Sequence, residues 1–384
     1  MLVDELTRLL SDLVSIPSVN PMGLGETGPE FLETRLGGHL ESWFRDAGID
    51  VVRQPIAPGR DNLLARYDAP GARRTLLFDA HQDTVPTDGM TIPPFEPRIE
   101  GGRLYGRGAC DVKAGMAAML IAFKRLHRER PAGSASVVMA CTVDEEFTHM
   151  GSSKLAETQK SIDLAIVAEP TLLNLVHCHK GAVRWKIRTR GVACHSSTPH
   201  RGVNAIYHMA RIVDALAEHA KELSRAEPHP ILGPPSLSVG RIEGGRSVNI
   251  VPDACEIQID RRMIPGETPA GCVERVRAFL ADRLGGLDDM EFDPPWVRMP
   301  ALETKLDDWG GALVAAIETA TGRTPELIGV PYGTDAGPLG EAGIPGVVFG
   351  PGDIAQAHTR DEWVELDQVR QAAEAYFQMA IALG

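Results

Sequence analysis

The chain has 384 residues, of which 43% are hydrophobic and 24% are charged, and its formal net charge is −13 at pH 7. Since this length exceeds what one core usually serves, we expect two domains. The acidic balance argues against nucleic acid or an anionic membrane as a partner, and any anionic substrate would need local Arg or Lys to hold it.

Residues 4–15 form an amphipathic pattern that predicts a helix. The N-terminal segment lacks a basic leader and a long apolar core, so we expect no signal peptide and a cytoplasmic location. No stretch approaches the roughly 18 apolar residues that span a bilayer. The six cysteines are widely spaced without a CxxC pair, which favours free thiols over disulfides.

Helices and strands alternate in the region up to residue 169. The patterns predict helices at 30–47 and 113–128, strands at 49–56, 62–68 and 74–81, and buried strands at 135–143 and 164–169. The last three strands lead into ligand-type residues, namely His81, Glu145 with Glu146, and Glu169. Chemistry at strand ends is typical of an α/β sheet whose carboxyl edge carries the site.

The pattern changes near residue 180 and changes back after residue 292. The middle region has alternating strands at 182–191, 237–245 and 254–263 and helices at 204–223 and 268–284, which is typical of an α+β unit with one covered sheet face. An alternation of helices and strands typical of α/β proteins then returns, with helices at 308–321, 337–342 and 366–382 and strands at 326–330 and 346–350. We therefore predict a discontinuous catalytic domain of residues 1–179 and 293–384, interrupted by a smaller domain of residues 180–292.

His81 and Asp83 form the first candidate motif, HQD. Residues i and i+2 of an extended backbone point to the same side, so the Asp83 carboxylate could accept a hydrogen bond from the His81 ring nitrogen that faces away from a metal. Such a contact fixes the tautomer and raises ligand basicity. A histidine that is simply hydrogen-bonded at a strand end is the alternative.

Asp111 stands in GRGACDVKAGM, just before a predicted helix. It can cap that helix or bridge two metals, and the two roles compete because a bridge needs both carboxylate oxygens. Asp144, Glu145 and Glu146 follow a buried strand, where three adjacent acids repel one another unless cations hold them. One glutamate would bind metal while the next acts as a general base. A solvated acidic turn is the alternative.

Glu169 and His358 complete the set, although each alone is compatible with an exposed surface residue. Together with His81, Asp111 and Glu146 they supply two imidazoles and three carboxylates. This is enough to hold two divalent metals about 3.5–4 Å apart. A donor set without thiolates favours catalytic zinc, with cobalt or manganese as alternatives.

The segments HQD, GRGACDVKAG, DEE, AEPT and GPGDIAQAH, in this order, resemble the signature of the zinc-dependent aminoacylase/carboxypeptidase family. The resemblance covers nearly the whole chain. It implies an α/β fold, in which a mixed-sheet, di-zinc α/β/α-sandwich hydrolase domain is interrupted by a smaller α+β lid domain. It also implies that two chains form a homodimer through the lid.

The resemblance further implies how the metals are held. His81, Asp111 and Glu169 would bind one metal, and Asp111, Glu146 and His358 would bind the other, with Asp111 as the bridge.

The resemblance also implies the roles of the groups around the metals. Glu145 would be the general base, and Asp83 would orient His81. A cis peptide bond is expected between Asp111 and Val112.

Residues of the lid and its flanking loop are implied as substrate contacts. His195 matches the histidine that reaches the partner subunit's site and hydrogen-bonds the developing oxyanion. Asn249 and Arg262 match residues that grip the substrate carboxylate, a task for which a guanidinium fork is suited. Gly333 and Thr334 match a glycine-rich loop that contacts the substrate.

The expected reaction is metal-dependent hydrolysis of the amide bond of a small N-acyl amino acid. Within the family, DEEFTHMGSSKLAE and GPGDIAQAHTRDEWVE are most similar to the acetylornithine deacetylase branch. Alternatives are a di-zinc exopeptidase acting on dipeptides or other small peptides, a desuccinylase-like activity on N-succinyl substrates, and a binding protein without turnover. DGMTIPPFEPRI is shorter than usual and lacks a tryptophan before Pro-Phe, so the acyl and amine preference stays open.

Overall fold

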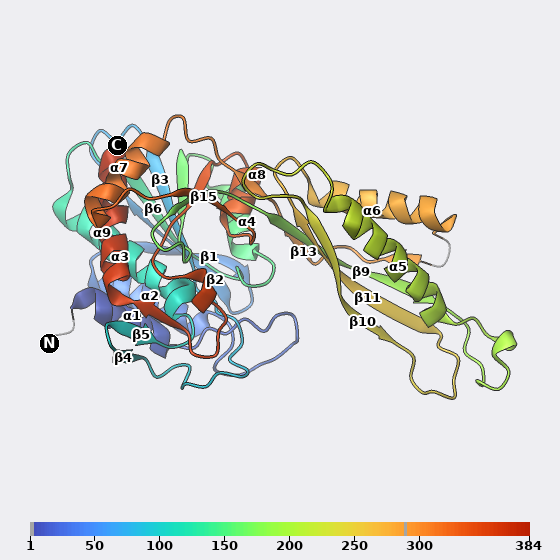
Figure 1. Ribbon diagram of the computed structural model, residues 1–384. Helices are drawn as coiled ribbons and strands as arrows, with labels where there is room; N and C mark the ends of the chain where they lie inside the picture. Colours follow the sequence, from blue (N-terminus) through green and yellow to red (C-terminus); the bar gives the residue numbers. More distant parts are fainter. Residues whose placement is uncertain (1–3, 288–289) are drawn as a thin grey trace. The chain divides into compact units, whose positions relative to one another are not determined.

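The computed structural model describes residues 4–287 and 290–384 (Figure 1). The chain divides into two compact units, of which unit 2 is an insertion. Unit 1 comprises Met1–His177, Glu303–Gly329 and Thr334–Gly384, and unit 2 comprises Cys178–Leu302 and Val330–Gly333. Residues 293–302, placed by the sequence analysis in the first domain, belong to unit 2. The assignment of catalytic and lid roles to the two domains stays a prediction.

A mixed sheet, ordered β1-β2-β6-β3-β7-β16-β8-β14 with β15 paired to β8, forms the centre of unit 1. Its strands are β1 Val51–Ala57, β2 Arg60–Tyr67, β3 Thr75–His81, β6 Ser136–Thr142, β7 Leu164–Val167, β8 Leu175–His179, β14 Leu302–Glu303, β15 Leu327–Val330 and β16 Gly346–Val348. Strands β6, β3, β7 and β16 run parallel to one another. Their carboxyl ends therefore meet at one edge of the sheet.

Helices cover both faces of this sheet (Figure 1). They are α1 Glu5–Ser15, α2 Thr34–Asp46, α3 Ala114–Glu129, α4 Met150–Thr158, α7 Gly310–Thr321, α8 Ala336–Glu341 and α9 Leu366–Ala382. Phe78, Met139 and Ile166 share a core with α1, α3, α7 and α9, whereas α8 packs on β7 and β16 and contacts α4. With both faces covered, β3, β6 and β7 are almost uniformly buried, which explains their unbroken apolar sequences.

A small three-stranded sheet in unit 1 was not predicted. It consists of β4 Arg98–Glu100, β5 Arg103–Tyr105 and β17 Trp363–Glu365 in the order β17-β5-β4. Trp363 pairs with Tyr105. The pairing brings the C-terminal loop beside the segment that precedes Asp111. Residues Ala109–Lys113, in which Asp111 and Val112 have non-helical backbone angles, lead from that segment into α3.

Unit 2 has an antiparallel sheet ordered β10-β11-β9-β12, with β13 also paired to β9. Its elements are β9 Gly181–Arg190, α5 Ala205–Leu223, β10 Ser236–Gly244, β11 Ala254–Met263, α6 Pro269–Leu284, β12 Met290–Phe292 and β13 Val297–Met299. Trp185, Ile187 and Ile257 pack under α5 and α6, and most of the alternate residues of β9 and β11 are polar or charged and partly exposed. The predicted one-sided α+β arrangement is confirmed, and β10 is an outer strand of the sheet.

The long predicted elements agree with the structure to within a few residues, except that α2 begins four residues later than expected. The sequence analysis missed α4, β8 and the short strands β12, β13 and β14. Within the described residues, none of the helices combines the length and the apolar character needed to cross a membrane. All six cysteines are free thiols.

Candidate metal centre

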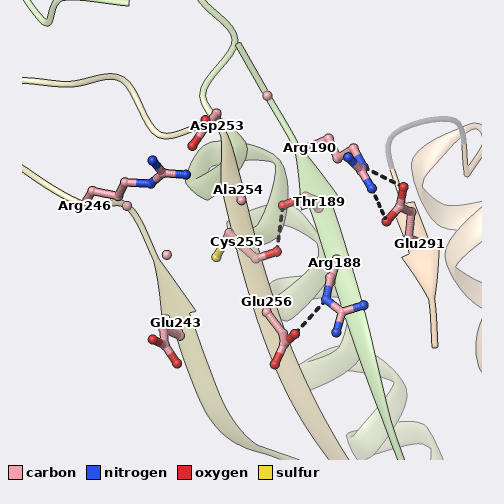
Figure 2. Close-up of a pocket in the computed structure, with 13 residues that line it drawn as sticks. Arg188, Thr189, Arg190, Glu243, Arg246, Asp253, Ala254, Cys255, Glu256 and Glu291 are labelled. Carbon is pink, nitrogen blue, oxygen red and sulfur yellow. Dashed lines mark hydrogen bonds and ion pairs between the residues drawn. The ribbon is translucent and has the colours of Figure 1, made fainter. Parts of the chain in front are cut away.

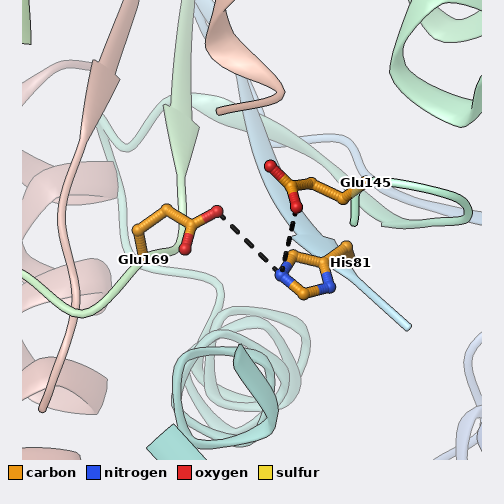
Figure 3. Close-up of side chains that lie close together, drawn as sticks. All are labelled: His81, Glu145 and Glu169. Carbon is orange, nitrogen blue, oxygen red and sulfur yellow. Dashed lines mark ion pairs between the residues drawn. The ribbon is translucent and has the colours of Figure 1, made fainter. Parts of the chain in front are cut away.

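Three parallel strand ends bring His81, Glu145 and Glu169 together. His81 is the last residue of β3, and the two glutamates follow β6 and β7. Nε2 of His81 lies 4.0 Å from Oε2 of Glu145 and 4.0 Å from Oε1 of Glu169. Figure 3 shows both carboxylates directed at this nitrogen. These buried side chains form a group that could hold one metal ion.

Asp111 lies between the two predicted histidine ligands. Its Oδ1 is 3.1 Å from Nε2 of His81, and its Oδ2 is 3.4 Å from Nε2 of His358. Nε2 of His358 is also 3.1 Å from Oε2 of Glu146. One oxygen toward each imidazole suits a bridging ligand. The alternative of a helix cap is not realised, because α3 begins without a side-chain cap bond.

The donor set fits divalent metal ions. His81, Asp111 and Glu146 form a second group whose ligand atoms lie within 4.8 Å of one another. Within residues 4–287 and 290–384, the buried Oε1 of Glu146 has no hydrogen-bond partner. Such an atom is costly to bury unless a cation or water accompanies it. All five predicted ligands therefore converge at one edge of the unit 1 sheet, and the site could bind metals.

The clustered charges shift several pKa values. Hydrogen bonds to Asp111 and Glu146 raise the pKa of His358 to about 11. Burial acts to raise the pKa of the Asp111 carboxyl, but hydrogen bonds to His358 and His81 lower it overall. Burial, reinforced by Glu169, raises the pKa of Glu145 well above its ordinary value. An upward shift suits a general base that works near neutral pH.

Glu362 holds the loop that carries Asp111. Its Oε1 accepts the N–H groups of Cys110 and Asp111 at 2.8 and 3.0 Å, and its Oε2 accepts the N–H of Gly108 at 3.0 Å and Nη1 of Arg107 at 2.8 Å. Gly108 has φ of 81°, and a Cβ there would lie 2.7 Å from Thr84. The sequence analysis missed Glu362, since an acid in a polar loop carries no distinguishing signal. The expected cis peptide bond between Asp111 and Val112 is present.

Asp83 contacts the acidic turn more directly than it contacts His81. Nδ1 of His81 bonds the backbone carbonyl of Asp83 at 2.9 Å, and the Asp83 carboxylate is 3.6 Å from that nitrogen. The carboxylate instead accepts the backbone N–H groups of Glu145 and Glu146 at 3.1 and 3.2 Å. The ring is therefore oriented by the backbone of residue 83, while the carboxylate shapes the turn that carries Glu145.

A buried ionic network also contacts the acidic turn, through Asp144. Arg60 forms a two-pronged contact with Glu33 and donates to Oδ1 of Asp144 at 2.5 Å. Asn20 donates Nδ2 to Asp83 at 2.8 Å and to Asp144 at 2.9 Å. The sequence analysis missed Arg60, Glu33 and Asn20, because they lie far from the acidic turn in the sequence.

His195 and Asn249 lie together in unit 2. His195 forms a β-bridge with Ile250, and the carbonyl of Asn249 accepts the N–H of Ser196 at 3.0 Å. The His195 ring is exposed, and its Nδ1 accepts the N–H of Ser197 at 3.2 Å. The hydrogen of a neutral ring is then on Nε2, which is available as a donor.

Arg262 lies at the other end of the same sheet. It pairs with Ala182 at the start of β9, whereas His195 follows the end of β9. From Ala254 to Arg262, β11 spans roughly 27 Å at about 3.4 Å per residue. The guanidinium also bonds Asp260, with Nε 2.7 Å from Oδ1 and Nη2 3.3 Å from Oδ2. If Arg262 binds a substrate carboxylate as predicted, that carboxylate would share or replace Asp260 as its partner.

Gly333 and Thr334 precede α8. Thr334 is fully buried, and its Oγ1 accepts the N–H of Ala336 at 3.2 Å. A Cβ on Gly333 would overlap the Met299 side chain, so glycine is required unless Met299 moves. The roles assigned from the sequence to Thr334, Gly333 and the other site residues stay predictions.

A charged hollow in unit 2 contains none of the predicted site residues. Figure 2 shows Arg190 paired with Glu291 and Arg188 paired with Glu256 along its wall. The distances from each arginine Nε to the carboxylate are 2.6 and 2.7 Å. Because these charges neutralise one another, the hollow presents no donor set comparable to that of unit 1.

Residues 77–382 match peptidase family M20/M25/M40. The chain is 34% identical over 352 residues to an acetylornithine deacetylase of Pectobacterium atrosepticum, a match that covers 88% of each protein. Its fold is similar to that of an M20 family metallo-carboxypeptidase of Sulfolobus solfataricus, with a TM-score of 0.80, 20% identity and 99% of each chain covered. It is also similar to a dinuclear metal-binding M20 peptidase of Bacillus subtilis, with a TM-score of 0.70, 17% identity and 98% and 96% covered.

Proposed function

Because the chain belongs to peptidase family M20/M25/M40 and is a metallohydrolase, we propose that it hydrolyses the amide bond of a small N-acyl amino acid. The observation that carries the proposal is the Asp111 carboxylate placed between His81 and His358, with Glu145 beside the imidazole of His81. The 34% identity to an acetylornithine deacetylase makes acetylornithine the first substrate to test.

Two divalent cations, with zinc favoured and cobalt or manganese as alternatives, would polarise the amide carbonyl and acidify water when held by the five ligands. Glu145 accepts a proton from water as the water attacks the carbonyl carbon. Glu145 then passes this proton to the amine nitrogen, and the C–N bond breaks. The second proton of the water leaves the new carboxyl group for the amine, so the products are a carboxylate and an ammonium group. His195 donates a hydrogen bond from its Nε2–H to the oxyanion that develops on the carbonyl oxygen.

We propose that the active form is a homodimer. Arg262 and His195 lie too far apart in unit 2 for one small substrate to contact both from a single chain. A second chain can supply the missing group. The outer strand β10 and its surroundings expose Tyr207, Ile242 and Val248, an apolar set that a partner would cover. The expected cytoplasmic location stays a prediction, supported by the six free thiols.

A substrate panel with the zinc-loaded protein tests the function. We expect amide hydrolysis of acetylornithine or another N-acetyl amino acid to exceed hydrolysis of N-succinyl amino acids and of dipeptides. Glu145→Gln should retain the metals and lose activity by about 10²-fold or more. A preference for dipeptides would favour the exopeptidase alternative. No turnover of any member, or wild-type turnover by Glu145→Gln, would contradict the proposed reaction or its base.

A further inference from the structure

Asp335 is a buried carboxylate near the metal centre that the reaction above does not use. It precedes α8 in unit 1 and is 1% exposed. Its Oδ1 accepts hydrogen bonds from Nδ1 of His149 at 3.0 Å and from Oγ of Ser152 at 2.6 Å. Its Oδ2 lies 3.0 Å from Oγ1 of Thr142, whose single hydroxyl hydrogen it shares with Oδ1 of Asp79 at 2.9 Å. Donors on both oxygens fix the orientation of the carboxylate.

The donors flank the turn that carries the general base. Thr142 is the last residue of β6, and His149 is the N-cap of α4, so Asp335 is bonded to both ends of the intervening segment. The backbone of His149 has φ of 57°, and its N–H donates to the carbonyl of Asp144 at 2.7 Å. Since α4 and α8 pack together, this contact is part of the helix packing.

The His149 ring lies beside the reacting carboxylate. Its Nδ1 is 3.8 Å from Oε1 of Glu145, while Oε2 of Glu145 is 4.0 Å from Nε2 of His81. Because Nδ1 donates to Asp335, the ring is held in one tautomer and one rotation. The Glu145 carboxylate is therefore confined between two imidazoles, one among the metal ligands and one held by Asp335.

We propose that His149 and Asp335 are positioning residues for Glu145. Asp335 fixes the His149 ring, and the ring keeps the Glu145 carboxylate directed toward the reacting water. The proposal rests on the function proposed above, in which Glu145 transfers the proton. A misplacement of about 1 Å can cost about 10²-fold in rate, so the pair should affect turnover more than substrate binding.

The His149→Phe variant tests the pair, because it removes the donor and keeps a ring. For the zinc-loaded enzyme with acetylornithine, kcat should fall at least about tenfold, while KM and zinc content change less than about twofold. His149→Asn keeps an N–H near the place of Nδ1 and should restore kcat to within about threefold of wild type. Asp335→Asn should lower kcat as His149→Phe does.

Ser152→Ala is the matched control, since it removes the other donor to the same oxygen and leaves His149 in place. Its kcat should stay within about threefold of wild type. A crystal structure of His149→Phe should show the Glu145 carboxylate in a changed orientation, which is a readout independent of activity.

Wild-type kcat in His149→Phe would overturn the proposal, as would an equal loss in Ser152→Ala and His149→Phe. If His149→Phe does not fold, wild-type kcat in Asp335→Asn overturns it. An active Glu145→Gln refutes the proposed base itself. An inactive Glu145→Gln beside a fully active His149→Phe refutes only the positioning pair.

Discussion

At the scale of single residues, the pKa values of the two candidate histidine ligands are both raised in the metal-free chain. In the metal-free chain, the hydrogen bonds to Asp111 and Glu146 raise the pKa of His358 to about 11, and hydrogen bonding to Asp111 overcomes burial to raise that of His81. A histidine can ligate a metal only after it gives up its ring proton. Metal and protons therefore compete for the same nitrogens.

Metal loading should release protons and strengthen as the pH rises. We expect at least about one proton to leave per chain at pH 7 as the centre fills, because the pKa of His358 is raised to about 11 and that of His81 is raised as well. Calorimetric titration of Zn²⁺ in buffers of different ionisation enthalpy measures this release. His358→Gln should release about one proton fewer. An apparent metal affinity that does not change between about pH 6 and pH 8 would contradict this expectation.

The raised pKa of His358 also determines in which direction pH changes the stability of the metal-free protein. The pKa of His358 is higher in the folded chain than the ordinary 6.5 of an unfolded one. Its contribution to stability is therefore complete below pH 6.5 and is lost as the pH rises toward 11.

At the scale of elements, the long helices and strands were predictable and the supports of the site were not. Fully buried strands such as β6 can be recognised as continuous apolar runs, and half-exposed strands such as β11 by their alternation of apolar and polar residues. The convergence of His81, Glu145 and Glu169 followed from the rule that parallel strands end at one edge. Glu362 and Arg60 could not be found this way, because their partners are distant in the sequence and no period marks a single buried charge.

Arg60 should be important for stability because it is a buried cation with two acidic partners, Glu33 and Asp144. Removing one partner of a buried ionic network typically costs about 3–5 kcal/mol, since the remaining charges are left uncompensated. We expect Arg60→Met to lower the free energy of unfolding by about this amount in urea titrations. Arg53→Met is the control, because Arg53 pairs with Glu41 and Asp61 at the surface and should cost no more than about 1 kcal/mol. Equal effects of the two substitutions would contradict this view of Arg60.

At the scale of the whole molecule, unit 2 combines a covered sheet face with an exposed outer strand. Helices α5 and α6 bury one face, whereas Ile242 on β10 and Tyr207 on α5 are 57% and 69% exposed. Exposed outer strands with apolar side chains tend to pair with another chain. This feature supports the proposed homodimer.

Disrupting that surface should separate the two chains. We expect wild-type protein to have twice the chain mass of 41.5 kDa in light-scattering measurements, and a protein carrying both Tyr207→Glu and Ile242→Arg to have the mass of one chain. Leu24→Arg, which changes an exposed apolar residue of unit 1, is the control and should leave the mass unchanged. A single-chain mass for the wild type would contradict the dimer.

The contacts of Glu362 have a consequence for biosynthesis. Glu362 is translated 251 residues after Asp111, and His358 shortly before Glu362, yet His358 faces Asp111 and Glu362 holds the loop that carries it. Strand β16, which lies between β7 and β8 in the sheet, is also translated late. A nascent chain can fold its earlier helices and hairpins, but the candidate metal centre stays incomplete until residues 358–362 have been translated. Acquisition of metal should therefore follow the synthesis of residues 358–362.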